Sequence, residues 1–421
     1  MKSGRLHYGW IVIFMGLLTT IAAHGFGRMS YTVILPSMKT ALNLSYTQMG
    51  WLGTGNFIGY LTMAIIGGFL AARYGTRIVI TLALILMGAT MVLTGLAHSF
   101  GFAFGMRLLT GLGNGASYVP AMALGSAWFA MQRRGFATGI VSAGIGTGMM
   151  ISGFMVPHIL GAFDQDGWRY SWYILGGAVA LISVIVYWFV RSRPDEIGLQ
   201  QVGVNQEEID SGASSDTQKA STMQWSEVVK MGSIWYLGVV YFFYGLSYII
   251  YLTFFTAYLV DLGISQVWAG RLFGWLGALS IFCGVIWGGI SDRLGRSKGS
   301  ALAYLVLAIS YIIYALSSIL FVSYEIKFGF ILSAIFFGLT AWSIPTIMAA
   351  AAGDFVGPRL APAGLGFITL FFGIGQAIGP ALGGYLRDIT QTFTVPFLVA
   401  AGISLVGMVA SIFLKKPDKS L

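Results

Sequence analysis

Long apolar runs alternate with short polar stretches along almost the whole chain of 421 residues. A helix that crosses a bilayer needs about 20 mostly apolar residues. Twelve runs reach that length, at 9–34, 48–71, 78–98, 101–129, 136–161, 170–190, 233–259, 267–290, 299–321, 328–351, 361–385 and 393–414. The one long polar stretch, 191–232, has the composition of a linker because it is acidic and almost free of aromatic residues. The pattern therefore predicts an all-α membrane protein with twelve transmembrane helices, divided into residues 1–190, a linker at 191–232 and residues 233–421.

Composition supports this class. The chain is 57% hydrophobic and only 9% charged, with a mean hydropathy of +0.79, and a soluble domain with so few charges would not stay in solution. The first apolar run is longer than the ~7–15 residues of a signal-peptide core, so we expect it to be retained as a helix. The single cysteine, Cys283, excludes an intramolecular disulfide and a thiolate metal cluster. The sequence predicts neither a metal nor a cofactor.

The basic residues indicate how the helices are oriented. Lysines and arginines gather at 73–77, 191–193 and 293–298 and in both tails, which all lie on one side of the membrane if the spans follow one another. Cytoplasmic loops carry this excess, so the linker and both termini are expected in the cytoplasm and the protein in a bacterial-type inner membrane. The same distribution accounts for the net charge of +9 without a nucleic-acid partner. Asp261 and Arg271 flank a short outer loop, where we expect them to form a solvated pair.

The two halves of the chain resemble each other. LNLSYTQMGWL at 42–52 matches LGISQVWAGRL at 262–272, and GGFLAARYGTR at 67–77 matches WGGISDRLGRS at 287–297, with the same offset. Six spans, a linker and six more spans indicate a parallel duplication, hence two pseudo-symmetric six-helix bundles. That architecture is typical of a secondary transporter whose site lies between the halves.

Three motifs occur at corresponding places in this architecture. They are G-x-x-x-D-R-x-G-R at Gly288, Asp292, Arg293, Gly295 and Arg296; R-x-x-x-G-x-G at Arg107, Gly111 and Gly113; and G-x-x-x-G-P-x-x-G-G at Gly375, Gly379, Pro380, Gly383 and Gly384. With them, essentially the whole chain resembles the major facilitator superfamily. The resemblance implies the major facilitator fold and an inner-gate role for the loop motif, namely for Gly288, Asp292, Arg293 and Arg296, and for Arg73 in the first half. The first copy of this motif has Ala72 where the family has aspartate.

Three further segments narrow the resemblance. HYGW at 7–10, WFAMQRRGFATGI at 128–140 and GWRYSWYILG at 167–176 are similar to the oxalate/formate antiporter and monocarboxylate transporter branch. That branch implies a small carboxylate substrate. The chain departs from it at Gly284, where the branch usually has arginine, and at 370–376, LFFGIGQ, which lacks the lysine of the oxalate type. The resemblance therefore leaves the substrate itself open.

Charged side chains inside the first and fourth spans are the strongest candidates for a site. An arginine at the centre of a spanning helix costs roughly 2.5–3.5 kcal/mol, so it needs a partner or a function. His24 and Arg28 are four residues apart and should be neighbours on one helical face. Arg107 should lie at the depth of Arg28, with Asn114 nearby, and the first six spans contain no carboxylate. We interpret the two arginines as half of an anion site; alternatively, Arg28 reaches the outer interface and Arg107 is a structural donor to backbone carbonyls.

The internal repeat indicates the opposite wall of this site. It maps His24 onto Tyr244 and Arg28 onto Tyr248, within an aromatic run that Trp342 of the tenth span could join. A cationic wall facing an aromatic one suits an organic anion with an apolar body. His24 is also the candidate proton carrier because histidine titrates near neutral pH; otherwise it is a hydrogen-bonded spacer.

These observations favour a secondary active transporter that moves a small organic anion, first of all a carboxylate, by alternating access. Coupling to protons and exchange both stay open. The alternative is an exporter of amphipathic drugs, which the aromatic wall would suit and which should tolerate the loss of Arg28. The chain has no HExxH, GxSxG or GxxxxGK[ST] motif, which argues against an enzyme and against ATP-driven transport. We expect a monomer in the lipid bilayer, whose partners are an anionic substrate and possible protons.

Overall fold

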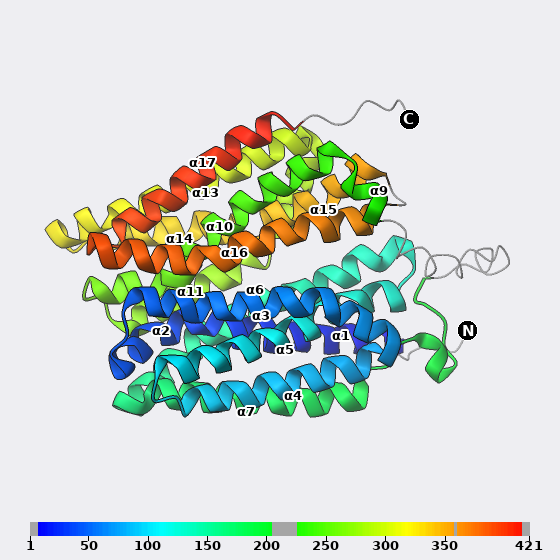
Figure 1. Cartoon of the computed structure of the whole chain (residues 1–421), viewed down its shortest axis with the longest axis horizontal. Coiled ribbons are helices and arrows are strands. Elements are labelled where there is room, and N and C mark those ends of the chain that lie inside the picture. Colours follow the sequence, from blue (N-terminus) through cyan, green and yellow to red (C-terminus); the bar gives the residue numbers. More distant parts are fainter. Residues whose placement is uncertain (1–6, 204–224, 358–359, 415–421) are drawn as a thin grey trace. The chain divides into compact units, whose positions relative to one another are not determined.

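The structure, a computed structural model, describes residues 7–203, 225–357 and 360–414. These residues form helices and turns, with one isolated β-bridge between Phe129 and Val202, which confirms the all-α prediction (Figure 1). The chain divides into two compact units, Met1–Leu42 with Gly55–Ser215 and Asn43–Thr54 with Asp216–Leu421. Residues 1–6, 204–224 and 415–421, which include both predicted cytoplasmic tails and half of the predicted linker, lie outside the described residues. The division at 191–232 and the sidedness of the termini stay predictions.

The first unit consists of helices from the first half of the chain. They are α1 (Tyr8–Thr20), the π-helix η1 (Ile21–Met29), α2 (Ser30–Leu42), most of α3 (Tyr46–Tyr74), α4 (Thr76–Gly95), α5 (Phe100–Trp128), α6 (Met131–Ala162), the short η2 (Asp164–Asp166), α7 (Gly167–Phe189) and the short η3 (Pro194–Ile197). Helix α4 packs against α5 and α7, while α6 packs against α1 and η1. This packing surrounds η1 with protein.

The second unit consists of helices from the second half of the chain. They are α9 (Trp225–Val229), α10 (Gly232–Asp261), α11 (Gln266–Ser280), α12 (Cys283–Leu294), α13 (Arg296–Tyr324), α14 (Phe328–Thr340), α15 (Ser343–Val356), α16 (Ala361–Thr390) and α17 (Thr394–Ile412). Helix α10 packs along α16 and α17, and α13 packs against α14 and α17. The aromatic run of α10 is therefore enclosed by helices of its own unit.

The first turns of α3 cluster with the second unit rather than with the rest of the helix. The Asp388 carboxylate of α16 accepts hydrogen bonds from the Tyr46 amide at 3.2 Å and from the Thr47 amide and hydroxyl at 2.7 and 2.6 Å. The hydroxyl of Thr54 donates to the carbonyl of Ala377 at 2.6 Å. A carboxylate at a helix N-terminus satisfies amides that have no partner within the helix, and it interacts favourably with the helix dipole.

The predicted outer pair of Asp261 and Arg271 is wrong. Asp261 instead forms an ion pair with Arg387 of α16, with 3.1 Å between Oδ2 and Nη2. The hydroxyl of Tyr46 donates to the same carboxylate at 3.0 Å. Arg387 also lies over the Tyr46 ring, 4.5 Å from its centroid, so the end of α10 is bound to α16 rather than to the start of α11.

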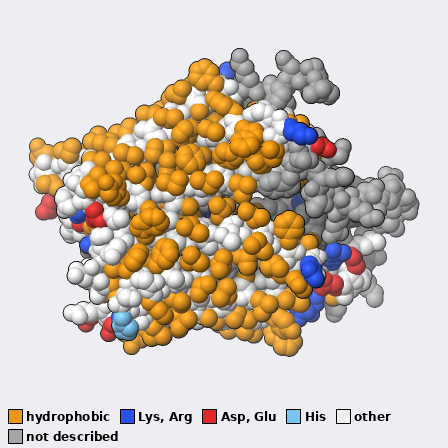
Figure 2. All heavy atoms as spheres, in the orientation of Figure 1, with side chains coloured by type: hydrophobic (Ala, Val, Ile, Leu, Met, Phe, Trp, Pro, Cys, Tyr) orange, Lys and Arg blue, Asp and Glu red, His pale blue; other side chains and the backbone are white. Residues whose placement is uncertain are grey.

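Ten helical segments of the described chain are long and apolar enough to cross a membrane, or eleven if the bent pair α11 and α12 is one span. Large exposed hydrophobic side chains cover the length of these helices, and charged side chains gather near helix ends (Figure 2). Helix α5, predicted as the fourth span, has 29 residues but is not among the ten, since glycines, Arg107 and Asn114 make it less apolar. The chain is thus a multi-pass membrane protein, while the count of twelve stays a prediction.

Three predicted spans are not the continuous α-helices expected. The run at 328–351 is divided into α14 and α15 by a turn at Ala341 and Trp342. The run at 267–290 is bent by 46° between Ser280 and Cys283, where amides at 281 and 282 bond three residues back instead of four. The first span extends from Tyr8 to Leu42, and its middle, Ile21–Met29, is π-helical. Segments of π-helix are rare and occur frequently at functional sites. This one contains His24 and Arg28.

Candidate functional site

His24 and Arg28 lie side by side in the first unit. Their exposed fractions are 4% and 6%, and Nη1 of Arg28 is 3.3 Å from Nε2 of His24, which confirms that the two share one helical face. A guanidinium only donates hydrogen bonds. Nε2 must therefore be the acceptor, and the imidazole in this contact is neutral.

Aromatic rings of α3 and α5 surround the pair. The Arg28 guanidinium lies 4.0 Å from the centroid of Phe57 and 5.1 Å from that of Tyr60, while the His24 ring lies 4.0 Å from Tyr118. A cation over an aromatic face is attracted by the ring quadrupole. These contacts hold Arg28 inside the unit instead of extending it toward an interface.

The π-helical segment is hydrogen-bonded through its backbone carbonyls by neighbouring helices. Three side chains donate to it: Asn114 to the carbonyl of Ala23 at 2.5 Å, Arg107 to that of Gly27 at 2.8 Å and Ser152 to that of Gly25 at 3.4 Å. A Cβ atom on Gly25 would meet the backbone of Gly148 in α6, so only glycine permits this approach. These partners give the physical reason why the segment departs from the α-helix that its sequence predicts.

Arg107 is directed at the backbone of the first span. It is 1% exposed, and its guanidinium lies between the rings of Tyr31 and Trp172, 4.8 and 5.1 Å from their centroids. Its bond to the Gly27 carbonyl places its charge next to Arg28, at the depth predicted. The geometry matches the structural alternative for Arg107. Asn114 likewise donates to a backbone carbonyl, that of Ala23. Substrate contact by either residue stays a prediction.

The buried charges of this unit have one sign. The first carboxylate in the chain is Asp164, which follows the fifth predicted span, so none lies within the helices that carry Arg28 and Arg107. Carbonyls and aromatic rings stabilise a guanidinium through dipoles and quadrupoles, which supply no full negative charge. No carboxylate of these helices therefore competes with an anion for the two guanidiniums.

The second unit contains an uncharged aromatic stack. Tyr244 and Tyr248 of α10 are parallel, with centroids 4.6 Å apart and 4° between their planes, and Phe372 of α16 stacks on both at 5.6 and 5.8 Å. The ring of Trp342, between α14 and α15, meets Tyr248 edge-on at 6.1 Å. The predicted trio thus lies together.

Sequence reasoning missed two members of this cluster, Phe372 and Gln376. The Gln376 amide donates to the hydroxyl of Tyr248, and the hydroxyl of Tyr244 donates to the carbonyl of Ala341. Both missed residues come from α16, which the internal repeat does not align with α10. The signals in the sequence were an isolated glutamine in an otherwise apolar run and its place in 370–376, the stretch that lacks the lysine of the oxalate type.

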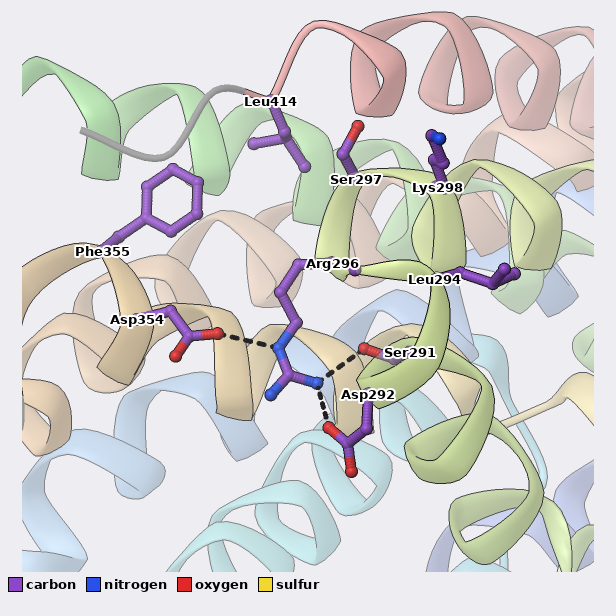
Figure 3. Close-up of a pocket in the computed structure, with 10 residues that line it drawn as sticks. Ser291, Asp292, Leu294, Arg296, Ser297, Lys298, Asp354, Phe355 and Leu414 are labelled. Atoms are coloured by element: carbon purple, nitrogen blue, oxygen red, sulfur yellow. Dashed lines mark hydrogen bonds and ion pairs between the residues drawn. The ribbon is translucent and has the colours of Figure 1, made fainter. Parts of the chain in front are cut away.

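The loop motif of the second half forms an ion-pair cluster beside a cavity of about 440 Å³ (Figure 3). Arg296 contacts the carboxylates of Asp292 at 2.7 Å and Asp354 at 2.9 Å and the hydroxyl of Ser291 at 2.7 Å. Sequence reasoning missed Asp354, which lies 62 residues further along the chain than Asp292 and has no motif of its own. Arg293 is exposed, and Gly288 faces Thr346 with ordinary spacing; the gating roles stay predictions.

The first half has a different arrangement at the matching loop. Arg73 is exposed and lies 5.4 Å from the ring of Tyr74. Arg77 donates to the carbonyl of Tyr187 at 2.7 Å. Among the described residues, this loop forms no ion pair, as Ala72 implies.

We expect Asp292→Asn to slow turnover much more than it weakens substrate binding. The pair with Arg296 is exposed on the aspartate side, so it should contribute no more than about 1 kcal/mol to stability, and the variant should fold. Loss of this ion pair removes one side of the bridge by which Arg296 connects the end of α12 to the end of α15. Transport rates in proteoliposomes and binding by thermal shift separate the two effects, with Asp164→Asn as the control. A variant that loses affinity but keeps its turnover number would refute a gating role for this cluster.

Comparison with known proteins identifies the family of this arrangement. The family model described as Major Facilitator Superfamily matches residues 17–347 and 303–421. The chain is 27% identical over 404 residues to a probable sulfoacetate transporter of Cupriavidus necator (92% of this chain, 89% of the relative). It is 24% identical over 402 residues to a hexuronate transporter of Bacillus subtilis (93% and 91%) and 23% over 427 residues to monocarboxylate transporter 12 of Homo sapiens (95% and 78%).

Solved structures share the fold at lower identity. A bacterial homologue of the human lysosomal transporter Spinster, inward-facing and unoccupied, matches with a TM-score of 0.71 and 18% identity, over 98% of this chain and 95% of that one. A point mutant of the nucleoside transporter NupG matches with a TM-score of 0.73 and 14% identity, over 96% and 100%. At these identities the likeness concerns the fold alone.

Proposed function

This chain belongs to the Major Facilitator Superfamily and is a secondary transporter rather than an enzyme, and we propose that it moves a small organic anion, first of all a carboxylate. Transport occurs by alternating access across a bacterial-type inner membrane, with both termini in the cytoplasm. It is coupled to protons or proceeds by exchange of one anion for another. The substrate contacts are those of Arg28, His24, Tyr244, Tyr248 and Trp342, while Arg107 and Asn114 contribute through the segment that carries Arg28.

One observation carries the proposal: two buried guanidiniums share one unit whose spanning helices contain no carboxylate. Intramembrane charges are costly and mark substrate pathways. An anionic substrate supplies a compensating charge while it is bound, and a guanidinium binds a carboxylate with two parallel hydrogen bonds. The charge pattern therefore favours an anion over a neutral or cationic substrate.

The relatives support the same class of substrate. Their names assign sulfoacetate, hexuronate and monocarboxylates to them, and each of these carries an acidic group. Identities of 23–27% leave the particular anion open. The aromatic stack on α10 and α16 suits a substrate with an apolar portion.

The alternative is export of amphipathic compounds, which the stack of Tyr244, Tyr248 and Phe372 favours because it has no charge. Such a transporter recognises ring faces and shape rather than one carboxylate. It should therefore act on cationic or neutral compounds, and Arg28 should be dispensable. Both properties are open to measurement.

A thermal-shift screen of the purified protein tests the proposal. A ligand at 100 times its dissociation constant stabilises the folded state by about 2.7 kcal/mol, which is measurable as a rise in Tm. We expect a rise with at least one of four classes, which are monocarboxylates, dicarboxylates, aromatic acids and sulfonates, and none with the methyl ester of the same compound. Stabilisation by cationic amphipaths alone would refute the anion and favour the exporter.

A further inference from the structure

A buried glutamine lies within the aromatic stack of the second unit. Gln376 of α16 is 1% exposed, and one end of its amide is bonded to the hydroxyl of Tyr248. The other end, Oε1, has no hydrogen-bond partner among the described residues. Amide oxygen and nitrogen are assigned from the hydrogen-bond network. Whichever way the amide is turned, one end bonds Tyr248 and the other is left for a further partner.

A second polar atom without a partner belongs to a residue whose ring packs against the same tyrosine. The Trp342 ring meets Tyr248 edge-on, at 70° between planes, and its buried Nε1 has no hydrogen-bond partner in the described part of the chain. The backbone of this tryptophan is fixed, because its amide donates to Sγ of Cys283 at 3.1 Å. An unsatisfied buried donor or acceptor destabilises the folded state, and native structures satisfy most such groups. Here two such atoms belong to Gln376 and Trp342, which both neighbour Tyr248, and this requires an explanation.

The surroundings of this pair carry no charge. No Lys, Arg, Asp or Glu occurs at 232–260 in α10, at 328–353 in α14 and α15, or at 361–386 in α16. Burying an anionic group against these helices would leave it without a counter-charge from them, which is strongly unfavourable. An uncharged hydroxyl, carbonyl or amide would satisfy the glutamine and the indole at no such cost.

We propose that Gln376 and Nε1 of Trp342 form a neutral hydrogen-bonding subsite that binds an uncharged polar group of the substrate. This inference rests on the proposed anion transport and specifies its substrate class as a monoanion that also carries a hydroxyl, carbonyl or amide group. With Oε1 as the free end of the amide, the amide and the indole N–H together offer an acceptor and a donor, which a hydroxyl matches with its own proton and lone pairs. A site built to hydrogen-bond a substrate group rejects the analogue that lacks it.

Three four-carbon acids that differ only at the far end test the subsite. They are butyrate, which ends in a methyl group, 4-hydroxybutyrate, which ends in a hydroxyl, and succinate, which ends in a second carboxylate. We expect the wild type to bind 4-hydroxybutyrate at least about tenfold more tightly than either of the others. Binding is measured by thermal shift and by competition against uptake of labelled 4-hydroxybutyrate in proteoliposomes.

Two substitutions of Gln376 have opposite expected effects. Gln376→Leu should weaken 4-hydroxybutyrate binding about tenfold, to the level of butyrate, and leave butyrate unchanged, because only the hydrogen bond is lost. Gln376→Lys adds a cation and should improve succinate relative to 4-hydroxybutyrate by at least about tenfold. Gln132→Lys, which adds the same charge at an exposed position, is the control and should change neither ratio.

Several results would overturn the subsite. They are equal binding of the three acids by the wild type, binding of none of them, or Gln376 variants that change all three affinities by the same factor, as a structural role would. Failure of the anion proposal gives a different result, in which no acid of any class shifts Tm in the wild type. A wild type that binds succinate most tightly keeps the anion proposal and removes the subsite.

Discussion

Arg28→Ala is expected to abolish uptake of the anionic substrate while the protein is still made and folded. The substitution removes a buried guanidinium that the proposal pairs with the substrate anion, and truncating one partner of a buried charge pair typically costs 2–5 kcal/mol. That corresponds to a loss of at least about 30-fold in affinity. The measurement is uptake of labelled substrate into proteoliposomes with matched amounts of inserted protein.

Further variants separate loss of the charge from loss of the fold. Arg28→Met keeps much of the contact with Phe57 and Tyr60 and should fold well, since it removes a buried charge whose desolvation is unfavourable. Arg28→Lys keeps a charge but loses the two-pronged hydrogen-bonding geometry, so it should retain little transport. Arg193→Ala removes an exposed cation outside the spans and should transport normally. Uptake by Arg28→Met near the wild-type level would refute the anion site and favour the exporter.

The sequence predicts the helical architecture well because the bilayer imposes it. A spanning segment must satisfy its own backbone groups and expose apolar side chains, so apolar runs locate most helices to within a few residues. What the runs cannot predict depends on partners from other helices. The π-helix at Ile21–Met29 is bonded by Asn114, Arg107 and Ser152, and no local pattern marks it. The bend between Ser280 and Cys283 likewise contains neither proline nor glycine between its ends.

The candidate site was likewise predicted where local sequence patterns determine it and missed where partners from other helices do. Spacing alone places His24 beside Arg28, and the internal repeat leads to Tyr244 and Tyr248, because both relations follow from helix geometry and duplication. Gln376 and Asp354 follow from neither, since each is a single polar residue whose meaning depends on the helix packed against it. A charged residue within an apolar run is rare and therefore indicates a functional position. A single glutamine, or an aspartate at a helix end, is common and indicates nothing by itself.

The contact between His24 and Arg28 restricts when the imidazole can take up a proton. Nε2 of His24 accepts from Arg28, so that nitrogen cannot be protonated while the contact lasts. An arriving anion would draw the guanidinium toward itself and leave Nε2 open to a proton. The proton and the anion should then each strengthen binding of the other, by about 1–3 kcal/mol or roughly 5–150-fold.

His24→Gln should abolish accumulation driven by a pH gradient while exchange of internal for external substrate continues. Glutamine can still accept from Arg28 through its amide oxygen, so the site keeps its shape, but it cannot carry a proton at physiological pH. Exchange needs no net proton movement and should be preserved. The measurement loads proteoliposomes with substrate for counterflow and, in a second set, imposes a pH step without internal substrate.

His98→Gln is the matched control for this experiment, because His98 is exposed in the first unit and bonds Arg169 rather than Arg28. It should accumulate substrate as the wild type does. Wild-type accumulation by His24→Gln would show that the proton does not travel on His24. Loss of both accumulation and counterflow would instead assign His24 to substrate binding alone, since a residue needed only for the proton leaves exchange intact. Loss of accumulation alone is the one result that requires a proton on this imidazole.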